Sequence, residues 1–137
     1  MNTLTTDRKY TVMLSAYQSI NSELTNLMET EKLAWIIEHD VHAHAIRAVG
    51  VFHGGAEQSF IVHTNSRQVV SMLKLIAIDN LHQECILVSN NRKHDIQLHN
   101  SDATTSHIGH AFKRSDKAPK GATSYTILNG CDYWSVK

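Results

Sequence analysis

The sequence predicts an α+β fold in which helices cover one face of a mostly antiparallel sheet. Strand-like apolar runs and segments of helical periodicity follow one another in the order strand, helix, strand, strand, helix, strand. That order is typical of a ferredoxin-like sandwich, the split βαβ arrangement. The turn dipeptide Asn129-Gly130 separates two further runs and predicts a C-terminal β extension. A length of 137 residues fits a single domain, residues 1–137.

The strands are expected at runs rich in β-branched, aromatic and aliphatic residues. These runs are Tyr10–Tyr17, Ala45–Phe52, Gln58–Thr64, Glu84–Ser89, Asp95–His99, Tyr125–Leu128 and Tyr133–Val136. The segment His53-Gly54-Gly55-Ala56-Glu57 has the turn residues of a hairpin. Polar loops are expected at Asn100–Ser106 and Ser115–Gly121, and no internal repeat is visible.

The first helix is expected to start at a cap, Asn21 or Ser22, and to run to about Glu38. Apolar residues at helical spacing predict the stripe that it buries against the core. That stripe comprises Leu24, Leu27, Met28, Ala34 and Trp35, widened near its end by Leu33, Ile36 and Ile37.

The second helix is expected to start at Thr64-Asn65-Ser66 and to run to about His82. It is apolar around most of its circumference, so that a second subunit is expected to cover part of it. The inner strands also indicate a covering subunit, because they carry apolar side chains on both faces while the helices cover only one face. The strand residues concerned are Val49, Val51, Ile61, Ile86 and Val88.

Composition excludes several classes of function. The chain has 13 Lys and Arg against 13 Asp and Glu, which argues against a general binder of nucleic acid or of membrane surfaces. No apolar run is long enough to span a membrane, and Met1–Lys9 has no apolar signal core. The spacing of Cys85 and Cys131 matches no zinc or redox motif, so reduced thiols in a cytoplasmic protein are expected.

The ten histidines raise two catalytic alternatives. His39, His42 and His44, with Asp40 between them, contain the donor types of a zinc or iron site. The segment crosses a helix end, however, where histidines also interact favourably with the helix dipole. The motif His99-Asn100-Ser101 is half of a two-histidine phosphoesterase site, which needs a second copy.

Other catalytic motifs are missing. His53-Gly54-Gly55 is similar to the oxyanion segment of esterases, but no Gly-x-Ser-x-Gly nucleophile elbow accompanies it. Neither a P-loop nor Gly-x-Gly-x-x-Gly occurs. Glu57 follows the glycines, which would let a ligand approach the backbone beside its carboxylate. The alternative for Glu57 is a solvated turn residue.

Three stretches resemble, in order, the bacteriophage-encoded enzymes that cleave S-adenosylmethionine, formerly called hydrolases and better described as lyases. The first is the strand end Leu14–Ser19. The second is the helix Gln68–His82 running into Gln83–Val88. The third is Pro119–Ala122, followed by Thr126-Ile127 and by Trp134–Val136.

The resemblance implies a homotrimer with active sites between subunits, which agrees with the separately predicted excess of apolar surface. It also implies conversion of S-adenosylmethionine to 5′-methylthioadenosine and homoserine lactone. The carboxylate of the substrate attacks its own γ-carbon and expels a neutral thioether, so that no cofactor, metal or protein nucleophile is required. The protein supplies a near-attack conformation, which is worth roughly 7–11 kcal/mol in well-oriented intramolecular reactions.

The resemblance also implies site residues. Glu57 aligns with an essential glutamate of the family and is assigned to binding the substrate's ammonium or ribose. Phe52 stands where the family has a tyrosine, and its ring can meet the sulfonium by a cation–π interaction. Ser15 and Tyr17 are candidate adenosine contacts, with core packing as the alternative for Tyr17, and Ser89 and Asn90 are weaker candidates.

Depletion of host S-adenosylmethionine, which is an anti-restriction function, is the leading hypothesis. Two alternatives remain open beside the histidine-based enzymes. One is a lyase of the same fold that acts on a nucleotide signal derived from S-adenosylmethionine. The other is a non-catalytic trimeric sensor of an adenine-containing ligand.

Overall fold

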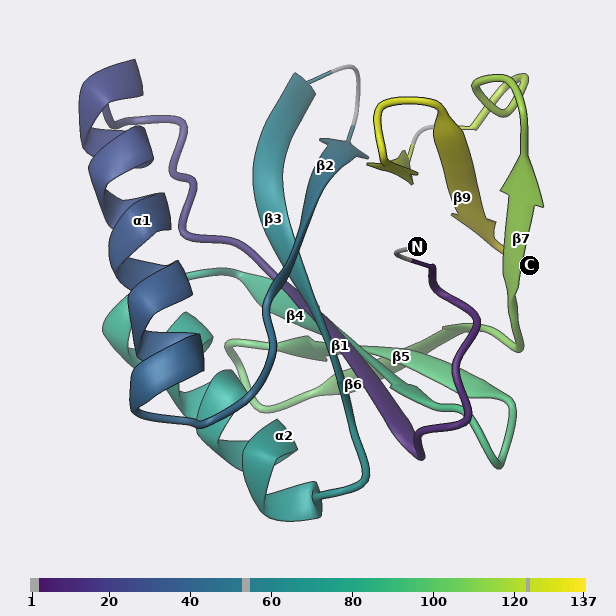
Figure 1. Cartoon of the computed structure of the whole chain (residues 1–137), viewed down its shortest axis with the longest axis horizontal. Helices are drawn as coiled ribbons and strands as arrows, with labels where there is room; N and C mark the ends of the chain where they lie inside the picture. The colour runs from purple at the N-terminus through teal and green to yellow at the C-terminus, as the bar shows by residue number, and fades with distance from the viewer. Residues whose placement is uncertain (1–2, 53–54, 123) are drawn as a thin grey trace.

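The computed structural model describes residues 3–52, 55–122 and 124–137. In the first two thirds of the chain, strands and helical segments follow one another in the expected order of strand, helix, strand, strand, helix, strand (Figure 1). In chain order they are β1 (Tyr10–Leu14), α1 (Glu23–His39), β2 (Ile46–Phe52), β3 (Gly55–Thr64), α2 (Arg67–Lys74), the π-helical turn η1 (Leu75–Asn80), β4 (Cys85–Asn90), β5 (Asp95–Asn100), β6 (Thr105–Gly109), β7 (Phe112–Ser115), β8 (Ser124–Leu128) and β9 (Asp132–Val136).

All of these strands belong to one antiparallel sheet with the order β6-β5-β4-β1-β3-β2-β8-β9-β7. The sheet curls, as Figure 1 shows, so that β7 to β9 lie opposite the β4–β6 end. Its two edge strands, β6 and β7, follow each other directly in the chain. The carbonyl of Lys137 accepts a hydrogen bond from His110 N at 2.7 Å beside this connection. An α+β architecture with two helical segments is therefore confirmed.

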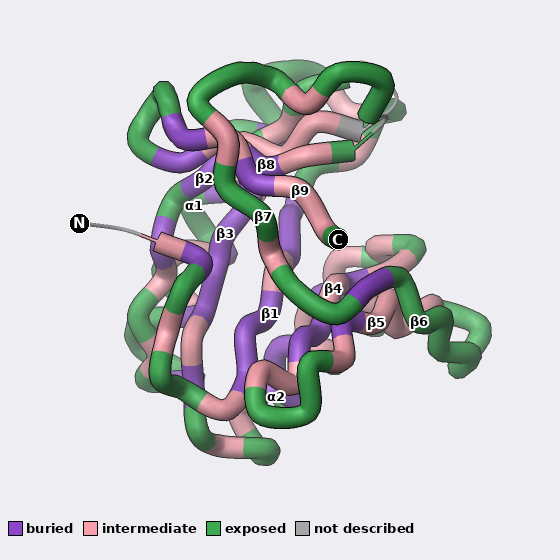
Figure 2. The backbone as a smooth tube through the Cα atoms, turned by 90° about the vertical axis from the view of Figure 1, so that its right-hand side faces the viewer, coloured by how far each residue is buried: buried purple, intermediate pink, exposed green. Residues whose placement is uncertain are grey.

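One face of the sheet packs against both helical segments. Alternate residues of β1, β3 and β4 point to this face, as strand geometry requires. The cluster consists mainly of Val12, Leu14, Phe60, Val62, Ile86 and Val88 from the strands and Leu33, Ile37, Val70, Leu73 and Ala77 from the helical segments. Figure 2 shows the resulting buried stretches along β1 and β3.

The predicted buried stripe of α1 is confirmed at Leu33 and Ile37, and at Ala34 and Ile36, which pack against the same cluster, but it was wrong for its other residues. Ser22 caps the helix as expected, with its Oγ accepting from Thr25 N at 3.1 Å. The core side, however, consists of Asn26, Thr30, Leu33 and Ile37, whereas Leu24, Leu27, Met28 and Trp35 are exposed. Polar residues are tolerated on the buried side because local hydrogen bonds satisfy them. Asn26 exchanges hydrogen bonds with the backbone of Gln18 at 2.9 and 3.0 Å, and Thr30 Oγ1 donates to the carbonyl of Asn26 at 2.7 Å.

The second helix begins at its predicted cap, Ser66, and changes to π-helical geometry at Leu75. Much of its apolar circumference is covered within the chain. Val70, Leu73 and Ala77 are buried, and further residues from Val69 to Leu81 pack against the same cluster. Met72 and Leu75 remain exposed.

The C-terminal hairpin of β8 and β9 forms around Asn129 and Gly130, both with positive φ (54° and 75°). By contrast, β6 and β7 were not predicted, and β6 occupies part of the loop expected at Asn100–Ser106. Four of the five β6 residues are exposed. Edge strands of this kind lack the apolar alternation on which strand prediction depends.

Candidate ligand cavity

The face of the sheet opposite the helices encloses a cavity of about 670 Å³. Its walls come from both ends of the curled sheet. Residues lining it are Leu4, Met13, Leu14, Ser15, Gly50, Val51, Glu57, Ser59, Gln83, Cys85, Ile86, Leu87, Leu98, Ile108, Phe112, Gly121, Ala122, Ser124, Tyr125, Thr126, Trp134, Ser135 and Val136. Among these, Glu57 is the one charged residue. A mostly apolar cavity of this size with a few polar groups is typical of a small-molecule site.

Glu57 is the third residue of β3 and lies opposite Gly50 of β2. The sequence placed it at a turn, whereas the strand begins two residues earlier, at Gly55. Glu57 is half-buried in the cavity wall. Burial raises the pKa of its carboxyl, and a hydrogen bond with the Ser15 side chain works in the opposite direction. The site therefore contains a partly desolvated carboxyl group that a cationic ligand would help to ionise.

Gly50 leaves space in front of this carboxylate. A Cβ atom at Gly50 would lie 3.6 Å from Ser59 Oγ, which is ordinary contact distance. A Cβ atom at position 50 would therefore not clash with the protein. The missing side chain gives a ligand room between Glu57 and Ser59.

Ser15 lies at the same end of the cavity, just after β1. Its Oγ donates to the carbonyl of Gln58 at 2.8 Å and accepts from Tyr17 N at 3.0 Å. Tyr17 is 36% exposed and does not line the cavity. Its carbonyl accepts a hydrogen bond from Gln83 Nε2 at 2.9 Å, so that it helps to hold a residue of the cavity wall.

The other predicted residues lie apart from this group or are not fully described. The backbone of Phe52 pairs with Gly55 and Ser124, but its side chain lies outside the described part of the structure. Ser89 and Asn90 are at the far end of β4, where Asn90 pairs with Tyr10 rather than approaching Ser15. Neither of them lines the cavity.

Ser89 belongs instead to a buried polar network. Its Oγ donates to Asn91 Oδ1 at 2.7 Å, and Asn91 Nδ2 donates to Thr11 Oγ1 at 2.9 Å. His63 lies 2.8 Å from Thr11 Oγ1 through Nδ1, and its Nε2 donates to the carbonyl of Thr3 at 2.8 Å. Burial lowers the pKa of His63 and so favours the neutral ring, whose Nδ1 can accept from the Thr11 hydroxyl.

Sequence reasoning missed several residues of the site, including Gly50, Ser59, Gln83, Cys85 and Trp134. Ser59 had a usable signal, because it lies two residues beyond Glu57 in a strand and therefore on the same face. Burial raises the pKa of the Cys85 thiol, and the nearby carboxylates of Glu84 and Glu57 raise it further. This keeps the thiol protonated and poorly nucleophilic.

The histidines proposed for a metal site are held by separate contacts. His39 stacks on Trp35 with ring centroids 4.6 Å apart, and its Nδ1 donates to the Trp35 carbonyl. His44 pairs with Glu38 at 3.5 Å, and His42 has a positive φ of 58°. No group of three or more His, Cys, Asp or Glu side chains in residues 3–52, 55–122 and 124–137 is arranged to hold a metal ion.

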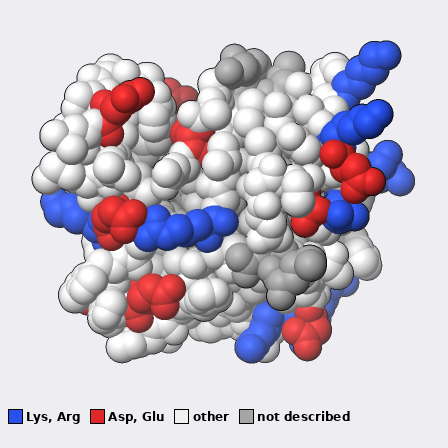
Figure 3. Space-filling model, turned by 45° about the horizontal axis from the view of Figure 1, so that its top comes forward, with Lys and Arg blue, Asp and Glu red and all other residues white. Residues whose placement is uncertain are grey.

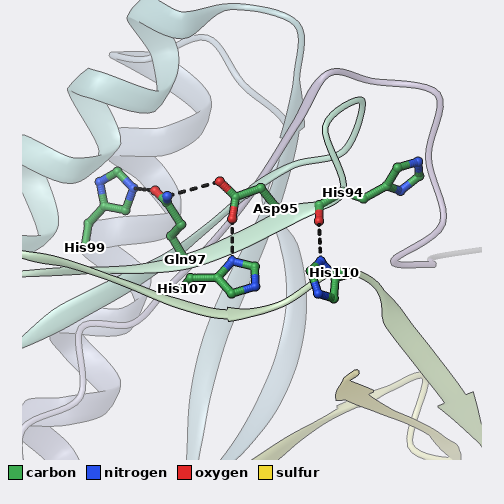
Figure 4. A network of polar contacts seen from close by, with 6 residues as sticks. All are labelled: His94, Asp95, Gln97, His99, His107 and His110. Carbon is green, nitrogen blue, oxygen red and sulfur yellow. Dashed lines mark hydrogen bonds and ion pairs between the residues drawn. The ribbon is translucent and has the colours of Figure 1, made fainter.

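Figure 4 shows the polar network formed by other histidines on β5 and β6. His107 Nδ1 lies 2.6 Å from Asp95 Oδ1, and Gln97 Nε2 donates to Asp95 Oδ2 at 3.1 Å. Gln97 also lies 3.2 Å from His99 Nε2. His99, the phosphoesterase candidate, therefore contacts a neighbouring amide in this network.

On the face shown in Figure 3, acidic and basic side chains are intermixed around a broad uncharged area. In the part of the chain that the structure describes, neither helical segment has the length and apolar character of a membrane span.

The fold and its cavity define a class: an α+β protein with a mostly apolar cavity on the open face of a curled antiparallel sheet. A sequence model described as the S-Adenosylmethionine lyase family matches residues 12–137. The chain therefore belongs to the S-adenosylmethionine lyase family. A search of curated proteins finds no match.

Proposed function

We propose that this protein cleaves S-adenosyl-L-methionine to 5′-methylthioadenosine and homoserine lactone. The observation that carries the proposal is Glu57, a half-buried carboxyl group in a 670 Å³ cavity whose other described wall residues are uncharged, in a chain that belongs to this lyase family. A sulfonium substrate combines an apolar body with positive charge. Such a wall matches both properties.

The reaction requires correct folding of the substrate rather than a nucleophile from the protein. A carboxylate oxygen of the methionyl group forms a bond to Cγ, and the Cγ–S bond breaks. Its electron pair stays on sulfur, which leaves as a neutral thioether. Holding the chain bent in this way supplies the orientational contribution of an intramolecular reaction. Apolar walls also favour loss of the positive charge, because the product sulfur needs no solvation as an ion. The chemistry calls for no cofactor and no metal.

Glu57 binds the substrate's ammonium group or a ribose hydroxyl and thereby fixes the reactive conformation. No nucleophile has to lose a proton, so Glu57 is not a general base. Its raised pKa supports this role, because an approaching cation restores the charge that burial disfavours. Ser15, beside Glu57, takes part in substrate binding. Phe52, Tyr17, Ser89 and Asn90 remain sequence-based proposals for substrate contacts.

The protein forms a homotrimer with active sites between subunits. Support comes from the exposed large apolar side chains of α1: Leu24, Leu27, Met28 and Trp35 are each at least half exposed. A second copy is the occupant whose chemistry matches such a stripe. In this trimer we place a neighbouring subunit over the open side of the cavity. Light scattering at micromolar concentration tests this, and a monomer would contradict it.

The wider proposals follow from this reaction. Depletion of S-adenosylmethionine in the host cytoplasm by a phage-encoded enzyme gives an anti-restriction function. The chain acts as one domain, residues 1–137, without nucleic-acid or membrane partners. The β4-β1-β3-β2 strand order supports a ferredoxin-like unit extended by β5 to β9. So do the two helical segments, which connect β1 to β2 and β3 to β4.

The test is incubation of purified protein with S-adenosylmethionine, with and without a chelator, followed by mass spectrometry. Formation of methylthioadenosine and homoserine lactone, unaffected by chelator, is expected. Intact substrate that nevertheless binds would favour the adenine-ligand sensor. Turnover that chelator abolishes would favour a metalloenzyme.

A further inference from the structure

Two buried polar atoms in the cavity wall have no hydrogen-bond partner among the described residues. They are the hydroxyl oxygen of Ser59 and the indole nitrogen Nε1 of Trp134. The side chains are only 8% and 6% exposed, and both line the cavity. A buried polar group without a partner destabilises a folded protein, so such groups are uncommon and call for an explanation.

The strand register places Trp134 in line with Glu57. Glu57 lies opposite Gly50, Gly50 opposite Thr126, and Thr126 opposite Trp134. Residues opposite each other share a face, and Glu57, Gly50, Thr126 and Trp134 all line the cavity. At a strand spacing of ~4.8 Å, this row is at most about 14 Å long. Ser59 lies two residues beyond Glu57 on β3, at the Glu57 end of the row, and its Oγ borders the space that Gly50 leaves open.

The two ends of the row differ in chemistry. Beside Glu57 are the polar side chains of Ser15, which hydrogen-bonds with it, and Ser59, two residues along the same strand. Trp134 belongs to an apolar cluster with Leu4 and Ile61, against which Phe112 packs, although Thr126 lies opposite it on β8. A carboxylate only accepts hydrogen bonds and an indole N–H only donates one. The cavity therefore offers a carboxylate acceptor at one end and, at the other, an indole donor that belongs to an apolar cluster.

We propose that Trp134 forms the subsite for the heteroaromatic base of the ligand, with its indole N–H donating to a ring nitrogen, and that Ser59 binds a hydroxyl of the adjoining sugar. This rests on the proposed function for the identity of the ligand, an adenosyl compound. The base lies among the apolar residues at the β9 end, and the cationic arm extends along the row to Glu57. Trp134 and Ser59 are binding residues and take no part in bond cleavage.

A purely structural role predicts a different outcome. If Trp134 Nε1 and Ser59 Oγ are simply unsatisfied, then removing them should leave ligand binding unchanged and should keep or raise the melting temperature. If they bind the ligand, removal weakens binding although stability does not fall. Comparison of affinity with stability therefore separates the two explanations.

The test uses Trp134→Phe and Ser59→Ala, with calorimetric titration of 5′-methylthioadenosine and, separately, of methionine. Loss of one neutral hydrogen bond should weaken methylthioadenosine binding ~3- to 10-fold in each variant. Methionine binding should not change in either variant. Ser71→Ala is the matched control for Ser59→Ala, because Ser71 is exposed and lies outside the cavity. Wild-type affinity in Trp134→Phe would overturn the proposal.

A second measurement does not depend on the folding of the variants. The wild-type protein is titrated with the 1-deaza, 3-deaza and 7-deaza forms of methylthioadenosine, each lacking one ring nitrogen. One analogue should bind ~3- to 10-fold more weakly than the parent compound, and Trp134→Phe should remove that difference. Equal binding of all three analogues would overturn the proposal. These titrations need no turnover, so that an inactive protein would contradict the proposed reaction and leave the base subsite standing.

Discussion

The two faces of β3 show how one strand serves both stability and binding. Phe60 and Val62, 1% and 0% exposed, point to the helices and belong to the main core. Glu57 and Ser59, on the other face, line the cavity. Phe60 and Val62 pack in an apolar cluster on the helix face, whereas the cavity face retains a half-buried carboxyl and an unpaired hydroxyl.

The cavity face therefore carries features that lower the stability of the folded protein. A desolvated carboxyl group, an unsatisfied hydroxyl and a glycine inside a strand are each unfavourable for folding. Helix-face packing supplies the free energy that offsets them. Substitutions on the two faces should therefore have opposite signatures: loss of stability on one, and loss of binding with stability retained on the other.

The largest effect is expected on the helix face. Phe60→Ala should lower the free energy of unfolding by about 3–5 kcal/mol, because it leaves a cavity in a closely packed core. Urea denaturation measures this. Phe112→Ala, on the cavity side, should cost clearly less, because Phe112 is already partly exposed. Equal losses would mean that the two faces do not differ.

The next effect separates activity from stability. Glu57→Gln should lower turnover of S-adenosylmethionine by roughly 10- to 100-fold, the equivalent of one hydrogen bond to a charged group. Its melting temperature should stay the same or rise, because burial of the carboxylate opposes folding at neutral pH. Steady-state kinetics and a thermal melt measure the two quantities.

Glu31→Gln is the matched control for this change. Glu31 is exposed and pairs with Arg47 at 2.8 Å, outside the cavity. It should keep full activity. If both variants were equally active, Glu57 would have no part in the site.

A smaller effect is expected at Gly50. Gly50→Ala adds a methyl group at ordinary contact distance from Ser59, so that the fold should tolerate it and gain up to about 1 kcal/mol. The methyl group enters the space assigned to the ligand, and the KM for S-adenosylmethionine should therefore rise. Unchanged KM together with unchanged stability would show that the ligand does not pass this position.

The smallest effect concerns pH. Burial lowers the pKa of His63, so that the unfolded chain binds a proton more readily than the folded protein. The stability contributed by neutral His63 is complete above the usual histidine pKa of about 6.5 and is lost as pH falls toward the lower folded value. Urea midpoints between pH 7.5 and 5 measure this loss, and His63→Asn should reduce it.

The parts of the fold that sequence reasoning predicted are those with strong apolar patterns. β1 to β4 and both helical segments are of this kind. The Asn129-Gly130 turn predicted the hairpin of β8 and β9. β6 and β7 were missed because their side chains are mostly exposed and polar. The N-terminal part of the apolar stripe of α1 was assigned to the wrong side, because hydrogen bonds made by Asn26 and Thr30 compensate their burial, which periodicity alone cannot reveal.

The site was predicted only in part, for a related reason. Glu57 stood out because it is charged and follows glycines, and Ser15 because it ends a strand. Trp134 and Cys85 reach the same cavity only through the curl of the sheet. Their sequence positions carry no sign of that curl. Ser89 shares a strand with cavity residues but lies at its far end, beyond the reach of Glu57.

The most direct test of the central claim, that an adenosyl substrate binds on the open face of the sheet, is a crystal structure of Glu57→Gln soaked with S-adenosylmethionine. The ligand should lie along the row from residue 57 to Trp134, with its base against the indole. Density for the ligand on the helix face, beside Trp35 and Arg47, would contradict the account.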